Sequence, residues 1–91
     1  MFYEVRYHPE VKAVDIPLLN ATLKKRIRKA IEERLMTAPQ QYGEPLRKSL
    51  KGYWKLRVED YRVVFKVVEN EVLVFGIINR KDVYELVLNR V

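Results

Sequence analysis

The chain has 91 residues, of which 18 are Lys or Arg and 12 are Asp or Glu, so its net charge is +6. This length suits one domain, and the balance of hydrophobic and charged residues is that of a folded globular protein rather than a disordered one. There is no cysteine and only one histidine, His8. This composition excludes a disulfide scaffold, a cysteine nucleophile, and a zinc site built from thiolates or paired imidazoles of one chain.

The first residues, 1–6, contain no apolar signal region, and no stretch approaches 18 apolar residues. We therefore expect a cytoplasmic protein that neither enters nor crosses a membrane. The positive surplus favours a polyanionic partner, either nucleic acid or an acidic protein, although a solvated basic surface would carry the same charge.

The N-terminal half predicts one strand followed by two helices. Residues 2–7 alternate between apolar and polar side chains, which is typical of a half-buried strand. Pro9 suits the first turn of a short helix over residues 10–14, which Pro17 then interrupts. Asn20 is the predicted N-cap of a main helix over residues 21–36. Its apolar stripe comprises Leu23, Ile27, Ala30, Ile31 and Leu35.

The C-terminal half predicts a loop, three strands and a short helix. Residues 40–49 contain Gly43 and Pro45, which predicts a loop or a short turn of helix. Strands follow at residues 53–58, 61–68 and 72–78, joined by turns at Glu59-Asp60 and within residues 69–71. From Arg80 onward a terminal helix would turn Val83, Leu86 and Val87 inward. The sequence thus predicts a single α+β domain over residues 1–91.

The turn at Glu59-Asp60 fixes which side chains share a face of the sheet. A two-residue turn places Arg57 directly opposite Arg62, and strand alternation then gathers the apolar residues on one face. These are Trp54, Leu56, Val58, Tyr61, Val63, Phe65 and Val67. The helical stripe needs such a partner surface, so we interpret Trp54 and Tyr61 as core residues rather than ligand-stacking ones.

The opposite face is predicted to be basic and exposed, with Tyr53, Lys55, Arg57, Arg62 and Lys66. Like charges in opposed positions destabilise a sheet by up to roughly 1 kcal/mol, and a bound anion would offset this repulsion. The third strand is expected to add Leu73, Phe75, Ile77 and Asn79 to the same face, with Arg62 beside Ile77 or Asn79. Guanidinium groups suit phosphate, and Tyr53 or Phe75 could stack on a base.

Two sequence motifs carry a resemblance to a known family. Residues 42–47 and 50–65, which include Gly52-Tyr53-Trp54 and Asp60-Tyr61-Arg62, resemble the central signature of RelE-type toxins. Residues 79–84, Asn-Arg-Lys-Asp-Val-Tyr, resemble the terminal His-Arg-Lys-x-Val-Tyr motif of that family. Residues 7–11 and 26–31 also fit. The chain therefore resembles the RelE/ParE toxin superfamily over nearly its whole length, and the RelE-like mRNA interferase branch in particular.

The resemblance implies a fold, an activity and partners. The family fold is a small antiparallel β-sheet of about four strands, with two N-terminal helices packed on one face and a short C-terminal helix. Relatives are toxins of type II toxin-antitoxin systems that bind the ribosome and cut mRNA by attack of the ribose 2′-OH on the adjacent phosphate, without a metal or other cofactor. The implied partners are a cognate antitoxin, the ribosome and mRNA, and operator DNA only as the toxin-antitoxin complex.

The resemblance also assigns roles to single residues. Arg62 would stabilise the phosphate, Lys55 would hold it or act as the base, Arg80 would act near the leaving group, and Tyr84 would orient or stack the nucleotide. The implied RNA-binding residues are Arg47, Tyr53, Arg57, Lys66 and Asn79.

Two departures from the family pattern weaken the implied chemistry. Asn79 stands where many relatives have a histidine, and it cannot titrate. Tyr53 stands where some relatives have a lysine. Lys55 could act as a base only if neighbouring cations favour its neutral form. Without that effect, cleavage would depend on positioning and charge and would be slow.

Two other functions stay open at this point. A ParE-like gyrase inhibitor would share the fold without the catalytic set, and the pair Arg80 and Tyr84 favours the RelE branch instead. A non-catalytic binding module is the other alternative, in which Asn79 marks lost activity. Structural roles also remain open, with Arg62 paired to a neighbouring glutamate and Tyr84 in the core.

Overall fold

The computed structural model describes residues 2–91, so Met1, the first residue of the predicted domain, lies outside the described residues. The N-terminal elements are β1 (Glu4–Tyr7), a π-helical turn η1 (Val11–Asp15), a 3-10 turn η2 (Ile16–Leu18), α1 (Ala21–Ala30) and a second π-helical turn η3 (Ile31–Leu35). The remaining elements are α2 (Pro39–Tyr42), β2 (Glu44–Pro45), η4 (Lys48–Leu50), β3 (Trp54–Val58), β4 (Tyr61–Val68), β5 (Glu71–Asn79) and α3 (Val83–Leu88). None of the helices in this part of the chain has the length and apolarity needed to cross a bilayer.

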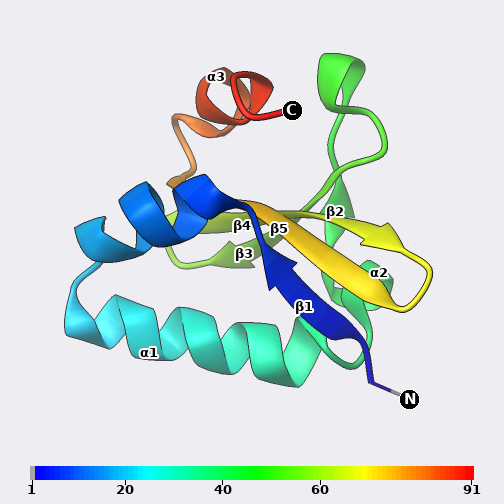
Figure 1. Ribbon diagram of the computed structural model, residues 1–91, viewed down its shortest axis with the longest axis horizontal. Helices are drawn as coiled ribbons and strands as arrows, with labels where there is room; N and C mark the ends of the chain where they lie inside the picture. The colour runs from blue at the N-terminus through cyan, green and yellow to red at the C-terminus, as the bar shows by residue number, and fades with distance from the viewer. Residues whose placement is uncertain (1) are drawn as a thin grey trace.

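The five strands form one mixed sheet in the order β1-β5-β4-β3-β2. β1 runs parallel to β5, and the other neighbours are antiparallel. α1 lies on one face of this sheet and α3 on the other (Figure 1). The α+β class is confirmed, and the sheet differs from the expected one of about four antiparallel strands by having five strands, one of them parallel to its neighbour. β2 has only two residues and is too short for a periodic pattern, and strand alternation does not reveal that β1 pairs with β5.

The predicted main helix is confirmed as the continuous pair α1 and η3. The side chain of Asn20 accepts a hydrogen bond from the N–H of Leu23 at 2.8 Å, so it caps the helix as predicted. The short helix predicted over residues 10–14 is confirmed: residues 9–10 are already helical, and η1 continues the helix to Asp15. Pro17 does not end the helical segment but lies within η2, where its missing N–H is not needed.

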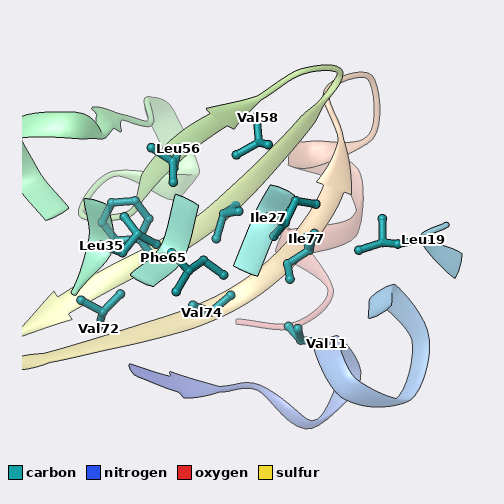
Figure 2. Close-up of a cluster of buried hydrophobic side chains, with 12 residues drawn as sticks. Val11, Leu19, Ile27, Leu35, Leu56, Val58, Phe65, Val72, Val74 and Ile77 are labelled. Atoms are coloured by element: carbon teal, nitrogen blue, oxygen red, sulfur yellow. The ribbon is translucent and has the colours of Figure 1, made fainter. Parts of the chain in front are cut away.

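The main core lies between α1, η3 and the sheet. Figure 2 shows Leu35 of η3 beside Phe65 and Ile27 of α1 beside Ile77 of the sheet, all in one buried cluster. Trp54 and Tyr61 are partly buried against this cluster, which confirms that they are core residues. The predicted register of the β3–β4 hairpin is also confirmed. Val58 lies opposite Tyr61 and Arg57 opposite Arg62, with the two-residue turn at Glu59-Asp60 between them.

A β-bulge in β5 changes the predicted face of its second half. Phe65 lies opposite Val74 and Val64 lies opposite Gly76, so Phe75 is one extra residue. The inserted residue reverses the alternation that follows. Ile77 therefore enters the main core, where Figure 2 shows it, and Asn79 lies opposite Tyr61.

The predictions that Ile77 and Asn79 lie on the basic face, next to Arg62, are therefore wrong. Ile78 lies opposite Arg62 instead, and Leu73 lies opposite Lys66 as expected. The sequence does not reveal the inserted residue, because β5 carries apolar residues at both odd and even positions, and either set could face the core.

The second face of the sheet is partly covered rather than open. α3 and the segment before β3 pack on it through a smaller cluster of Leu46, Leu50, Val64, Ile78, Val83 and Val87. Val83 and Val87 are buried as predicted, but Leu86 is exposed, so its inward placement is wrong. The covering segments leave a hollow above one end of β3 and β4.

Candidate functional site

The hollow lies on the second face of the sheet and has a volume of about 280 Å³. Its lining residues come from the segment before β3, from β3 and β4, from the segment before α3 and from the first turn of α3: Leu46, Lys55, Arg62, Arg80, Lys81, Val83 and Tyr84. All four residues predicted to be catalytic meet here, although they are distant in sequence. Four of the seven lining side chains are cationic, so the hollow is suited to an anion.

Arg62 is the central cation of the hollow and is only 9% exposed. Its Nη1 donates hydrogen bonds to the carbonyl oxygens of Glu59 at 2.9 Å and Tyr61 at 2.8 Å. These bonds fix the guanidinium at the hairpin end. Its Nε and Nη2 have no hydrogen-bond acceptor among residues 2–91 and remain available to a ligand.

The environment of Arg62 opposes its positive charge. Burial, followed by the charges of Arg57 and Arg80, lowers the pKa of the Arg62 guanidinium, while Asp60 and Glu44 act in the opposite direction. The expectation of an exposed Arg62 is wrong, because the segment before β3 and the start of α3 enclose it. An anion in the hollow would relieve the repulsion among these cations.

Lys55 and Arg57 share the face of Arg62, as predicted, but only Lys55 reaches the hollow. Lys55 lies opposite Val64 and is therefore a diagonal neighbour of Arg62. Arg57 is exposed and lies beyond the two-residue β2, at the open edge of β3. There it borders a different hollow, with Arg26, Lys29, Glu33 and Arg34.

Arg80 and Tyr84 form the other wall of the hollow. The backbone N–H of Arg80 donates to the carbonyl oxygen of Asp60 at 2.9 Å, and its side chain approaches the Asp60 carboxylate at 4.0 Å. Tyr84 is 42% exposed, which rules out the alternative that it is a core residue. Its hydroxyl accepts a hydrogen bond from the N–H of Arg47 at 3.3 Å. Arg47 therefore touches the site through its backbone.

The remaining predicted RNA-binding residues lie outside the hollow. Tyr53 packs edge-on against Phe75, with ring centroids 5.2 Å apart, and Lys66 Nζ lies 5.3 Å from the Tyr53 ring centroid. Asn79 accepts a hydrogen bond from the N–H of Lys81 at 3.1 Å and borders a separate hollow that includes Asp15.

The sequence reasoning missed a carboxylate near the hollow. β2 places Glu44 directly opposite Lys55, and the Glu44 charge is close enough to act on Arg62. The residue pattern of 40–49 predicts only a loop or a short turn of helix, so it assigns Glu44 to no face of the sheet. The only available signal was its position within the family-like run of residues 42–47.

A comparison with protein-family models shows which family the chain belongs to. The family described as "ParE toxin of type II toxin-antitoxin system, parDE" matches residues 3–84. The chain therefore belongs to this family of type II toxin-antitoxin toxins, within the RelE/ParE superfamily. No curated protein sequence matches the chain.

Solved structures share the fold at low sequence identity. The toxin-antitoxin complex RelBE2 from Mycobacterium tuberculosis matches with a TM-score of 0.81 and 22% identity, covering 88% of this chain and 100% of that one. A mutant of the E. coli toxin RelE in the free state matches with a TM-score of 0.77 and 19% identity, covering 100% and 99%. The RelB-RelE antitoxin-toxin complex from Methanococcus jannaschii gives a TM-score of 0.63 and 19% identity, covering 88% and 95%.

Proposed function

We propose that this toxin is a ribosome-dependent mRNA endonuclease that inhibits translation, with the hollow as its active site. The observation that carries the proposal is the convergence of Lys55, Arg62, Arg80 and Tyr84 on one hollow. RNA cleavage by the ribose 2′-OH needs a proton acceptor, positive charge around the phosphate and stabilisation of the leaving oxygen. The hollow and its surroundings offer a residue for each of these tasks.

Arg62 is suited to stabilise the pentavalent phosphorane. Because its Nη1 is already bonded to two backbone carbonyls, its remaining donors are held in place before RNA arrives. Preorganised donors of this kind act on developing charge without a cost for reorganisation. Lys55 adds a second cation from the adjacent strand.

Glu44 is suited to accept the proton of the 2′-OH. The 2′-oxygen then attacks the phosphorus, and the bond from phosphorus to the 5′-oxygen breaks. Arg80 supplies positive charge at the 5′-oxygen, which takes a proton from solvent. The products are a 2′,3′-cyclic phosphate and a 5′-hydroxyl, so atoms and charge balance. A carboxylate base opposite Lys55 removes the need for Lys55 or Asn79 to fill that role.

The exposed part of Tyr84 can stack on the nucleotide at the cleavage point, with its hydroxyl held by Arg47. The RNA and the ribosome would also contact the cationic and aromatic residues that flank the hollow. These are Arg47, Tyr53, Arg57 and Lys66. These targets imply that the protein acts in the cytoplasm.

We further propose that an acidic antitoxin neutralises the toxin, and that operator DNA is bound only by their complex. The relatives from M. tuberculosis and M. jannaschii were solved as toxin-antitoxin complexes. A groove of about 250 Å³ on the helical side suits an acidic amphipathic segment. Its floor is apolar and includes Ile16 and Ile27. Its rim carries three cations that form no ion pair among residues 2–91: Lys12, Lys24 and Arg28.

A ParE-like gyrase inhibitor is the second candidate, because the matching family is described as ParE toxins. Purified protein tested on programmed ribosomes and on DNA gyrase separates the candidates. Cuts in mRNA, lost in Arg62→Ala, would support the proposal. DNA breaks through gyrase would replace it with the second candidate. Neither activity would leave a non-catalytic binding module.

A further inference from the structure

Asp15 and Arg90 form an ion pair between the two ends of the chain, 75 residues apart. Arg90 Nη1 lies 2.6 Å from Asp15 Oδ2, and Arg90 Nη2 lies 2.8 Å from Asp15 Oδ1, so the contact is bidentate. The side chains are 9% and 4% exposed. Every other ion pair within residues 2–91 joins side chains that are substantially exposed.

The pair is also bonded to the backbone of β5, at the bulge residue Phe75 and at Ile77 just beyond it. The N–H of Ile77 donates to Asp15 Oδ2 at 2.9 Å, and Arg90 Nη1 donates to the carbonyl oxygen of Phe75 at 3.1 Å. β1 pairs with β5 only as far as Val74, so β5 has no strand neighbour on that side beyond this residue. The pair therefore supplies hydrogen-bond partners to two backbone groups of β5 beyond the end of its pairing with β1.

Arg90 follows α3, a helix that cannot be stable alone. α3 has six residues, and isolated helices shorter than about 12 residues are marginal in water. Val83 and Val87 hold it on the sheet, and the Arg80 N–H bonded to Asp60 holds the segment before it. The bond from Arg90 to Asp15 fixes the other end.

We propose that Asp15 and Arg90 are positioning residues of the hollow. They hold the end of α3 against β5, and thereby keep Val83 and Tyr84 in place as its wall. They act through α3, because neither residue lines the hollow. The consequence for cleavage rests on the proposed function, whereas the consequence for α3 does not.

The two residues cannot exchange places, because the N–H of Ile77 needs an acceptor at position 15 and the carbonyl oxygen of Phe75 needs a donor at position 90. Exchanging the two residues, as Asp15→Arg with Arg90→Asp, restores opposite charges. However, the N–H of Ile77 would then face a donor, and the carbonyl oxygen of Phe75 would face an acceptor. The exchange should therefore fail to restore the position of α3. Asp15→Asn keeps an acceptor for Ile77 and should be milder than Arg90→Met, which leaves a buried carboxylate without its cation.

The test compares Arg90→Met with Leu35→Ala, a cavity variant in the main core that does not touch the hollow. Hydrogen exchange of the α3 amides and single-turnover cleavage are measured at temperatures that give both variants the same folded fraction. In Arg90→Met we expect α3 to lose protection while β3 and β4 keep theirs. Cleavage should fall by roughly tenfold or more, since a displacement of about 1 Å in a site can cost 10²-fold. Leu35→Ala should show neither effect.

Protection of α3 in Arg90→Met equal to that in Leu35→Ala would overturn the inference. Rescue by the exchanged pair would overturn the part of it that depends on the backbone groups of Ile77 and Phe75. If Arg90→Met does not fold, Asp15→Asn takes its place, with the same two readouts and a smaller expected loss. If the wild-type protein cleaves no RNA, the proposed function fails, and hydrogen exchange alone decides whether the pair holds α3. Loss of α3 protection would then support the pair's role in a protein that does not cut RNA.

Discussion

Arg57 and Arg62 lie directly opposite each other on β3 and β4, in a cross-strand position that favours opposite charges. Their environments differ, because Arg57 is exposed at a sheet edge and Arg62 is buried and bonded to two backbone carbonyls. Burial and the Arg57 charge both lower the pKa of Arg62. The fold therefore holds one guanidinium in an unfavourable position that a bound phosphate would relieve.

Removing the exposed partner should stabilise the protein. We expect Arg57→Thr to raise the free energy of unfolding by up to about 1 kcal/mol, because it removes the opposed like charge and adds a residue that favours strands. Thermal unfolding at low and high salt measures this gain, which should shrink as salt screens the repulsion. Lys51→Thr, a change of the same charge on an exposed turn, is the control and should leave the stability unchanged. A less stable Arg57→Thr would show that the opposed arginines do not repel each other.

Removing Arg62 should abolish most of the cleavage. We expect Arg62→Ala to lower the single-turnover rate on saturated ribosomes by about 10²–10³, the usual cost of losing a preorganised donor to developing charge. It should also lower the free energy of unfolding by about 1–3 kcal/mol, because the carbonyl oxygens of Glu59 and Tyr61 lose their donor.

Arg62→Lys tests the same site with the charge kept. It should recover little of the rate, since a lysine cannot serve both carbonyl oxygens and the phosphate with a planar fork. Arg57→Thr is the control on the same face. Arg57 does not line the hollow, and saturated ribosomes mask a loss of binding, so this variant should cut RNA at close to the wild-type single-turnover rate. If Arg62→Ala cuts at the wild-type rate while folded, the hollow is not the active site.

Substitutions of Glu44 and Lys55 should have different effects on RNA binding and on cleavage, because we propose Glu44 as the base and Lys55 as a phosphate ligand. We expect Glu44→Gln to lower the single-turnover rate by roughly 10²–10⁴, the usual contribution of general base catalysis, with RNA binding unchanged. Lys55→Met should weaken RNA binding as well as cleavage, because it removes a cation from the hollow. Binding is measured with uncleavable RNA that carries 2′-deoxyribose at the cleavage point. A full rate in Glu44→Gln, together with a large loss in Lys55→Met, would return the base role to Lys55.

The sequence predicted those parts of the site that depend on local pairing. The turn at Glu59-Asp60 determines the register of β3 and β4, so the shared face of Lys55, Arg57 and Arg62 followed from strand alternation. The expectation that Arg80 and Tyr84 belong to the same site came from the family resemblance. Nothing in the residue pattern predicts where a helix of six residues packs.

The errors arose where pairing is non-local. The bulge at Phe75 moved Ile77 and Asn79 to the other parity. Beyond the end of the β1 pairing, backbone groups of Phe75 and Ile77 bond to Arg90 and Asp15. No periodic signal marks such a bulge, and no sequence pattern joins residues 75 positions apart. The position of Glu44 depends on a two-residue strand, which is shorter than any period that can be read from a sequence.

The place of Asn79 predicts that restoring a histidine there has little effect. Asn79 borders a hollow other than the proposed active site, and its side chain accepts a hydrogen bond from Lys81 within a turn. We therefore expect Asn79→His to change the single-turnover rate by less than about threefold. A change of that size corresponds to under about 1 kcal/mol in the activation free energy. The rate is measured between pH 6 and 8, where histidine titrates. A large gain that follows histidine ionisation would show that Asn79 does reach the reacting groups.

The rim of the helical groove should decide how the antitoxin binds. Lys24 and Arg28 lie one turn apart on α1 and border the groove, whereas Lys25 and Lys29 lie on the same helix and do not line it. We expect Lys24→Glu with Arg28→Glu to weaken antitoxin binding by about tenfold or more, which is about 1.4 kcal/mol.

Much of this loss should appear in the association rate, and it should shrink at high salt, because rim charges steer encounter. Lys25→Glu with Lys29→Glu changes the net charge equally and is the matched control. Association is measured with the purified cognate antitoxin across a salt series, and cleavage assays show that both double variants remain active. Equal losses in the two double variants would mean that net charge alone attracts the antitoxin. In that case the groove would not be its binding surface.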